Sequence, residues 1–176
     1  MIDNPIIKSL CERRSVKSYK PEQIADEQLD TILEAATYAP TGRNAMSPVM
    51  VVVQDAELLA KIEKLNAVAI GDPGSHPFYG APTVVVVFGN PEYSHWMEDA
   101  SLVAGNLLNA AHAVGVGGCW IHRARPVFET PEGKAMMRAW GVPENFIGVA
   151  NCILGYQDAP AKPRVARKEG YVIKAR

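Results

Sequence analysis

The run "TVVVVF" at positions 83–88 is the strongest architectural feature of this sequence, because a threonine is followed by five apolar residues without a break. A second run, "VMVVV" at 49–53, has the same character. Neither run alternates apolar with polar residues, so each predicts a strand that is covered on both faces. We therefore expect a central sheet of four or five strands with helices on both sides.

Two helices are expected before the first of these strands. Asn4 followed by proline is an N-cap signature, and it predicts a helix that runs to about Glu12 with Ile6 and Leu10 on its buried side. A second helix follows Asp26 and ends before Pro40. The remaining expected elements are helices over 56–67 and 130–141, strands over 115–121 and 147–156, and an extended basic tail.

The longest helix is expected over 94–114. Its apolar residues surround nearly the whole circumference, and such a helix is buried either in a core or between subunits. One domain of 176 residues can seldom cover so long a helix completely, so the pattern predicts a subunit interface. Glu98 and Asp99 lie near its start, where acidic side chains suit the helix macrodipole.

Charge and composition exclude several classes of protein. The 18 basic and 19 acidic side chains leave a formal net charge of −1, which creates no overall field for nucleic acid or an anionic membrane surface. No apolar stretch reaches the ~18 residues of a membrane span, and the first twenty residues hold no apolar run of signal-peptide length. Cys11, Cys119 and Cys152 show no metal-binding spacing, so we expect reduced thiols in a cytoplasmic protein.

The stretch "CERRSVKSY" (11–19) places four hydrogen-bonding side chains within five residues. Arg13, Arg14 and Lys17 are cationic, and Ser15 adds a hydroxyl, so the group suits an anion. An alternative is that Arg13 and Arg14 only complement the carboxyl end of the first helix. The segment by itself leaves both interpretations open.

Motifs for catalysis by protein side chains are absent. There is no GxGxxG, no GxxxxGK[ST] and no GxSxG sequence. The four histidines form no HExxH pattern, so a metal site is not expected. If the protein is an enzyme, its chemistry is expected to come from a cofactor.

Four motifs occur in a fixed order: "RRSVKSY", "AATYAPTGRNAMSPVMVVV", "GGCWIHRA", and "ILGY" with a tail that begins "AKPR". With them the whole chain resembles the short members of the FMN-dependent nitroreductase family. The resemblance implies an α+β fold, a three-layer sandwich whose central, mostly antiparallel sheet is flanked by helices. It also implies one FMN-binding domain over residues 1–176, in an intertwined homodimer that exchanges its C-terminal strands.

The resemblance also implies a flavin site. The phosphate would be held by the N-terminal segment, while Lys17 would lie near N1 and O2 of the flavin and tune its potential. Met46 and Ser47 depart from a glutamine-proline pair that is common in the family, and His122 is open to two interpretations, backbone contact or proton donation. Arg167 and Lys168 compete with Lys162 and Arg164 for the phosphate. The cofactor-binding residues implied are Arg13, Arg14, Ser15, Lys17, Pro40, Thr41, Gly42, Asn44, His122, Arg123, Lys162 and Arg164, of which residues 40–44 would come from the second subunit.

The implied reaction is ping-pong. NADH or NADPH would pass a hydride to flavin N5 and leave, and a nitroaromatic or quinone acceptor would then take it in a rather open pocket. Three alternatives remain open: a flavin-binding sensor or FMN store without turnover, a small-anion binding domain without flavin, and a specialised member that dehalogenates a substrate or fragments the flavin. The expected partners are a second copy of the chain and a small acceptor, with neither nucleic acid nor membrane.

Overall fold

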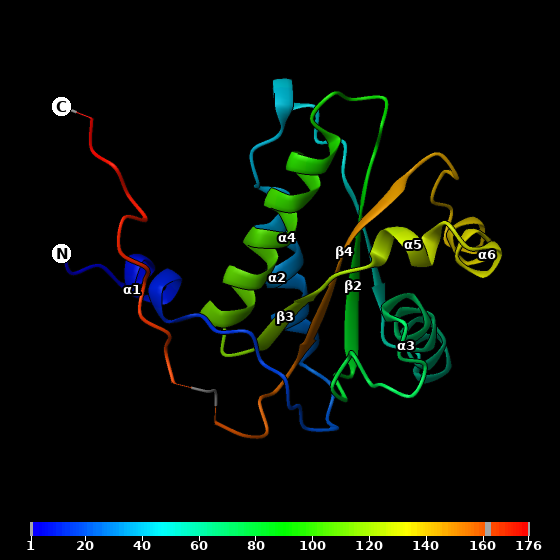
Figure 1. The fold of residues 1–176 in the computed structure, drawn as a ribbon, viewed down its shortest axis with the longest axis horizontal. Coiled ribbons are helices and arrows are strands. Elements are labelled where there is room, and N and C mark those ends of the chain that lie inside the picture. Colours follow the sequence, from blue (N-terminus) through cyan, green and yellow to red (C-terminus); the bar gives the residue numbers. More distant parts are fainter. Residues whose placement is uncertain (1, 161–162, 176) are drawn as a thin grey trace.

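The protein is a three-layer α+β sandwich (Figure 1). A computed structural model describes residues 2–160 and 163–175. One face of the central sheet is covered by α2 (Asp26–Thr37) and α4 (Trp96–Ala113), and the other by α3 (Ala56–Ile70), α5 (Ala124–Phe128) and α6 (Pro131–Ala139). This arrangement confirms the expected fold class.

The sheet has four strands in the order β1-β2-β4-β3, and all neighbouring strands are antiparallel. The strands are β1 (Val49–Val53), β2 (Thr83–Gly89), β3 (Gly117–Ile121) and β4 (Ile147–Gly155). All seven residues of β2 are buried, as its unbroken apolar run predicts. β1 is also covered on both faces, by Val49 and Val51 packing on one core and Met50 and Val52 on the other, but only its Val53 is fully buried. β1 forms one edge of the sheet, and an edge strand has no neighbour to cover its outer side.

Alternate residues of β2 build two separate cores. Val84, Val86 and Phe88 face α3, α5 and α6, whereas Val85 and Val87 face α2 and α4. In the first core the rings of Phe88 and Phe128 meet edge to face, with centroids 4.9 Å apart. Helices on both faces therefore bury a strand that carries no polar residue after Thr83.

The long helix α4 is covered on one side only. Val103, Leu107 and Ala111 are buried against the sheet and α2, whereas the side chains of Met97 and Leu102 are 47% and 46% exposed. The chain by itself therefore leaves part of the apolar surface of α4 open, as the prediction of an interface requires.

Helix α1 (Pro5–Glu12) begins and ends where the sequence predicts, and Asn4 Oδ1 accepts a hydrogen bond of 2.9 Å from the Ile6 amide. The expectation that Ile6 and Leu10 form a buried side is wrong, because these side chains are 68% and 48% exposed. α1 rests on the outside of α4 and does not reach the sheet (Figure 1).

Two short elements were not anticipated from the sequence. A 3₁₀ turn, η1 (Gly42–Asn44), precedes β1, and α5 follows β3 directly. None of the helices in the described ranges combines the length and the hydropathy that a membrane crossing requires.

Candidate functional site

The N-terminal segment is fixed to the edge of the sheet by its backbone. The Val16 amide donates to the Gly118 carbonyl at 3.1 Å, and Ser15 pairs with Gly118 in a parallel bridge. Gly117 makes this approach possible, since a Cβ there would lie 2.9 Å from Val16 Cγ2. Val16 is buried, so its neighbours Ser15 and Lys17 point the other way and are exposed.

Arg14 has the structural role that the sequence left open. Its Nη1 donates to the carbonyls of Cys11 at 3.2 Å and Arg13 at 2.7 Å, where α1 ends. These bonds satisfy carbonyls that have no partner inside the helix. The guanidinium of Arg13 is half-buried and forms no hydrogen bond or ion pair with any described residue. The donors of Arg13 are therefore uncommitted within the described residues.

Lys17 is held by an aromatic ring that sequence reasoning missed. Its Nζ lies 5.5 Å from the centroid of the Tyr79 ring, within the range of a cation–π interaction. Tyr79 itself has a left-handed backbone, with φ 54°. Nearby, the buried hydroxyl of Tyr19 donates to the Val16 carbonyl at 2.8 Å, and burial raises the pKa of Tyr19, so this phenol stays neutral.

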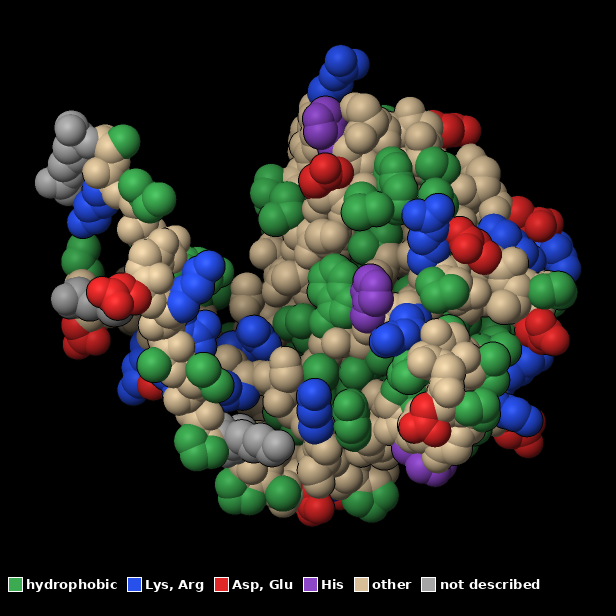
Figure 2. All heavy atoms as spheres, viewed as in Figure 1, with side chains coloured by type: hydrophobic (Ala, Val, Ile, Leu, Met, Phe, Trp, Pro, Cys, Tyr) green, Lys and Arg blue, Asp and Glu red, His purple; other side chains and the backbone are tan. Residues whose placement is uncertain are grey.

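A cavity of about 370 Å³ lies between this segment and the C-terminal tail. Arg14, Ser15, Lys17, Gln157 and Arg167 are among the residues that line it. Basic side chains gather where the tail leaves the body of the protein (Figure 2). Among the basic residues of the described tail, Arg167 is therefore the one that the structure places in this lining. Arg164 is exposed outside this lining, and Lys162 lies outside the described residues.

The loop over residues 40–46 is a second candidate segment. The Gly42 amide donates to Asp99 Oδ1 at 2.9 Å, and the Met46 amide donates to Thr41 Oγ1 at 3.0 Å. Arg43, Asn44 and Met46 have φ of 54°, 54° and 48°, which for such residues costs on the order of 1–3 kcal/mol each. Pro40, Thr41 and Asn44 border a cavity of about 640 Å³ together with Tyr38 and Met46.

The loop and the N-terminal segment do not meet within one protomer. Asp99 places the loop at the amino end of α4, whereas Arg14 and Val16 share a cavity with His112 near its carboxyl end. Asp99 and His112 are thirteen residues apart, which is about 20 Å of helix. Figure 1 shows η1 and residues 13–17 at opposite ends of α4.

His122 and Arg123 follow the last residue of β3. His122 is exposed, and Arg123 has a left-handed φ of 78° as it begins α5. Neither side chain forms a hydrogen bond with the described part of the chain. His122 lies four residues beyond Gly118, about 13 Å along the strand from the N-terminal segment. The N-terminal segment and His122 therefore lie near opposite ends of β3 and do not touch.

Two of the three cysteines are buried in the cores. Cys119 and Cys152 are buried, Cys11 is exposed, and all three are free. Burial raises the pKa of Cys152 to about 12, so its thiol is protonated at neutral pH. The described residues include no group of three side chains arranged to hold a metal ion.

Three residues near these segments escaped sequence reasoning. Tyr79 faces Lys17, Gln157 lines the basic cavity, and Asp99, which the sequence associates only with the helix macrodipole, binds the loop over residues 40–46. Each joins segments that are far apart along the chain. No local pattern could have indicated them.

Known proteins share both this sequence and this fold. The sequence profile described as "Nitroreductase family" matches residues 10–156. A protein of Archaeoglobus fulgidus named "Putative NADH dehydrogenase/NAD(P)H nitroreductase" is 32% identical over 156 residues, which cover 85% of this chain and 84% of that protein. The chain belongs to the nitroreductase family.

Solved structures agree with this assignment. The nitroreductase with bound FMN from Bacteroides fragilis has a TM-score of 0.91 and 26% identity, over 99% of this chain and 100% of the other. The nitroreductase with bound FMN from Desulfitobacterium hafniense has a TM-score of 0.85 and 27% identity, over 97% of this chain and 100% of the other.

The donor groups of this structure fit an FMN phosphate. Arg13 has uncommitted guanidinium donors, Ser15 exposes a hydroxyl, and the nearby cavity carries the basic side chains of Lys17 and Arg167. A phosphate monoester carries about −1.5 to −2 charges at neutral pH, and guanidinium groups match its oxygens in a bidentate manner. The residues present are therefore compatible with the cofactor of the family.

Proposed function

We propose that this protein takes a hydride from NADH or NADPH and delivers it, in a ping-pong reaction, to a nitroaromatic or quinone acceptor. Membership of the nitroreductase family makes the chain an oxidoreductase, with FMN as cofactor and NAD(P)H as co-substrate. When bound, FMN supplies N5 as the atom that accepts the hydride and passes it on. The observation that carries the proposal is the pairing of Val16 with Gly118, which turns Ser15 and Lys17 outward beside a basic cavity.

In this proposal Arg13 and Ser15 bind the phosphate, and the C-terminal tail supplies the remaining contacts to it. Arg167 supports that role because it lines the same cavity as Ser15. Arg14 contributes by capping α1, which orients the chain as it enters the segment. Arg164 and Lys162 remain candidates for the same phosphate.

Lys17 carries the electrostatic part of the proposal. Its ammonium is exposed on the outer side of the segment and rests over the Tyr79 ring. Placed near N1 and O2, it stabilises the negative charge that collects at that edge on two-electron reduction. A charge-assisted hydrogen bond of this kind is worth about 1.5–3 kcal/mol.

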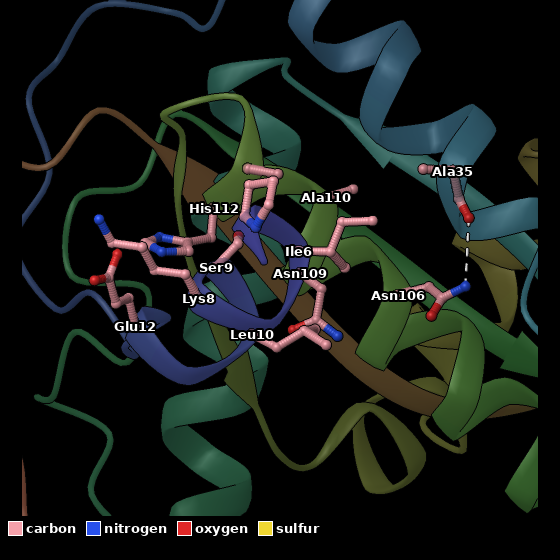
Figure 3. A pocket seen from close by; sticks show the side chains of 12 residues that line it. Ile6, Lys8, Ser9, Leu10, Glu12, Ala35, Asn106, Asn109, Ala110 and His112 are labelled. Carbon is pink, nitrogen blue, oxygen red and sulfur yellow. Dashed lines mark hydrogen bonds between the residues drawn. The ribbon is translucent and has the colours of Figure 1, made fainter. Parts of the chain in front are cut away.

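Pro40, Thr41, Gly42 and Asn44 act in the proposal from the second subunit of a homodimer. Two features support the dimer: the loop is too far from residues 13–17 to reach the same flavin within one chain, and α1 and α4 leave an apolar groove between them. The groove has a volume of about 660 Å³, and Ile6 and Leu10 of α1 lie along Asn109 and Ala110 of α4 (Figure 3).

The exposed tail is a third support for the dimer. Val165, Tyr171, Val172 and Ile173 are all more than two-thirds exposed, so they are available to pack on a partner. Exchange of these C-terminal segments between subunits is part of the proposal. Residues 1–176 then form one FMN-binding domain, as the single sheet shared by both cores supports.

His122 and Arg123 complete the proposed site through their backbone, beside the N5 edge of the flavin. Their position at the end of β3, on the strand to which the N-terminal segment is fixed, supports this role. The free thiols of Cys11, Cys119 and Cys152 support a reducing compartment, and we place the activity in the cytoplasm.

A visible spectrum tests the proposal. The purified protein, supplied with FMN and passed through a desalting column, is expected to retain yellow absorbance. Mixed anaerobically with NADH or NADPH, it is expected to lose that absorbance within seconds and to regain it on addition of menadione, a quinone. Initial rates at several menadione concentrations are expected to give parallel double-reciprocal lines.

The alternatives give different results in the same experiment. A sensor or FMN store retains the yellow absorbance but does not bleach within turnover time. A small-anion binding domain stays colourless after FMN is supplied. A specialised member bleaches, but menadione and nitrofurazone do not restore its colour. Any of these three results would overturn the proposal.

A further inference from the structure

We propose that Asp99 is a positioning residue, which holds the loop over residues 40–46 so that Asn44 meets the flavin of the partner subunit. This inference rests on the proposed function, because it concerns the same flavin site. Asp99 touches neither the cofactor nor the acceptor in this scheme. It acts through the backbone of Gly42.

The contact itself is a part-buried, charge-assisted hydrogen bond. The Gly42 amide donates to Asp99 Oδ1 at 2.9 Å, and only 3% of the Asp99 surface is exposed. A carboxylate that accepts from a backbone amide forms a stronger bond than a neutral acceptor does, and burial reduces competition from water. The bond joins α4, which packs on the sheet, to a loop that does not.

The loop needs such a support because its backbone is strained. Arg43, Asn44 and Met46 all have left-handed φ values, a conformation that side chains with a Cβ disfavour. Such conformations persist only where surrounding contacts determine them. Within the loop, the Asn44 amide donates to the Thr41 carbonyl, the Ala45 amide to the Gly42 carbonyl, and the Met46 amide to Thr41 Oγ1.

Asp99 is the side chain outside the loop that bonds its backbone in the described structure. Close packing also restrains the backbone at Gly42, since a Cβ there would lie 3.1 Å from His95 Nδ1. The amino end of α4 therefore determines where the loop begins its left-handed turn. The exposed amide of Asn44 follows two residues later, at the rim of the 640 Å³ cavity.

The dissociation constant of FMN tests this inference in a double-mutant cycle, with the full-length protein titrated by fluorescence quenching. The variants are D99A, N44A and the double variant, with D99N as the conservative replacement. E98A is the matched control, because Glu98 is an exposed acidic residue in the same first turn of α4. Circular dichroism and thermal unfolding of each apoprotein report whether the fold is kept.

The expected result is non-additive. D99A and N44A each weaken FMN binding about tenfold, and the double variant weakens it by about the same factor, because both changes remove the one contact made by Asn44. D99N keeps an acceptor oxygen at the same place, so its dissociation constant stays within about threefold of wild type. E98A also binds FMN as the wild type does.

Two results would overturn the inference while leaving the proposed function intact. One is an about hundredfold loss in the double variant, which would show that Asp99 and Asn44 act independently. The other is an unchanged affinity in folded D99A. If D99A does not fold, the FMN affinity of D99N and the hydrogen-exchange rate of the Gly42 amide in the wild type are used instead. A Gly42 amide that exchanges as fast as an exposed one contradicts the hydrogen bond to Asp99. Wild-type protein that binds no FMN would instead overturn the proposed function.

Discussion

The sheet core and the rim of the molecule differ in how completely a single chain buries their residues. We define the rim as α1, residues 13–17, residues 40–46 and the exposed side of α4. In the core, every residue of β2 is buried, and the hydroxyl of its one polar residue, Thr83, donates to Gln23 Oε1 at 2.7 Å. In the rim, α1 has no buried residue.

This difference indicates what each region depends on. The core is complete within one chain, so its changes should alter the stability of the protomer and leave the affinity for FMN alone. In our proposal, the rim is completed by a second copy of the chain and by the cofactor. Changes there should alter assembly or the flavin while each protomer stays folded, and the predictions below test this division.

Leu102→Glu is expected to give the largest effect. A charge without a partner, placed in a subunit interface, costs several kcal/mol, so the dissociation constant of the dimer should rise about a thousandfold. FMN binding should fall with it, because the loop over residues 40–46 is then lost from the site. Analytical ultracentrifugation measures the change.

Val68→Glu is the matched control, since Val68 is also an exposed apolar residue, 55% exposed, but on α3 across the sheet. A dimeric Leu102→Glu variant would show that this side of α4 is not an interface.

Arg13→Ala should weaken FMN binding by about ten- to hundredfold. The lost charge-assisted hydrogen bonds are worth about 1.5–3 kcal/mol, and each 1.4 kcal/mol is a factor of ten. Arg14→Ala is the comparison: its guanidinium is already bonded to the end of α1, so FMN affinity should change less than threefold. Isothermal titration with FMN gives both values. Equal losses in the two variants would refute the division of roles between the arginines.

Lys17→Met should lower the two-electron potential of the bound flavin by about 30–60 mV, the equivalent of about 1.5–3 kcal/mol. Lys17→Arg keeps the charge and should change the potential far less. Both are measured by dye-equilibrated titration at fixed pH. A potential that is the same in the methionine and arginine variants would exclude an electrostatic role for this side chain.

Cys152 gives the smallest effect, and it concerns the core. Burial raises its pKa from 9.0 to about 12, so above pH 9 the unfolded chain ionises while the folded chain does not. This stabilisation is complete below pH 9 and is lost as the pH rises toward 12, at about 1 kcal/mol per pH unit. Urea unfolding with a reductant should therefore show a shallower decline between pH 9 and 10.5 in Cys152→Ala than in wild type. Identical slopes would contradict the shifted pKa, and FMN affinity per folded protein should not change.

The sequence predicted the helices and strands that are specified by neighbouring residues, such as a cap or an apolar run. Asn4 and Thr130 cap helices at the expected positions, and the apolar run over 83–88 forms the central strand. α5 was missed because "ARPVF" is five residues long and contains Pro126; it is helical where Ala124, Val127 and Phe128 pack into the core. Likewise, the pattern of α1 identifies its apolar side but not what that side packs against.

The sequence predicted which segments form the candidate site, but it did not predict the contacts between them. The sequence indicated a basic segment over 13–17, and the resemblance added the loop over residues 40–46. Neither could reveal that Tyr79 lies over Lys17 or that Asp99 binds Gly42, because these pairs are brought together only by the fold. The structure also shows that Arg14 donates hydrogen bonds to the end of α1 while it lines the basic cavity, which the sequence alone could not reveal.

The bridge between Ser15 and Gly118 affects how the protein is made. Residues 13–17 leave the ribosome early, but the strand to which they attach is translated much later, seconds afterwards at about 5–20 residues per second. Until then the nascent chain has no fixed place for its basic segment. Cofactor binding at this segment is therefore expected only after β3 has been synthesised.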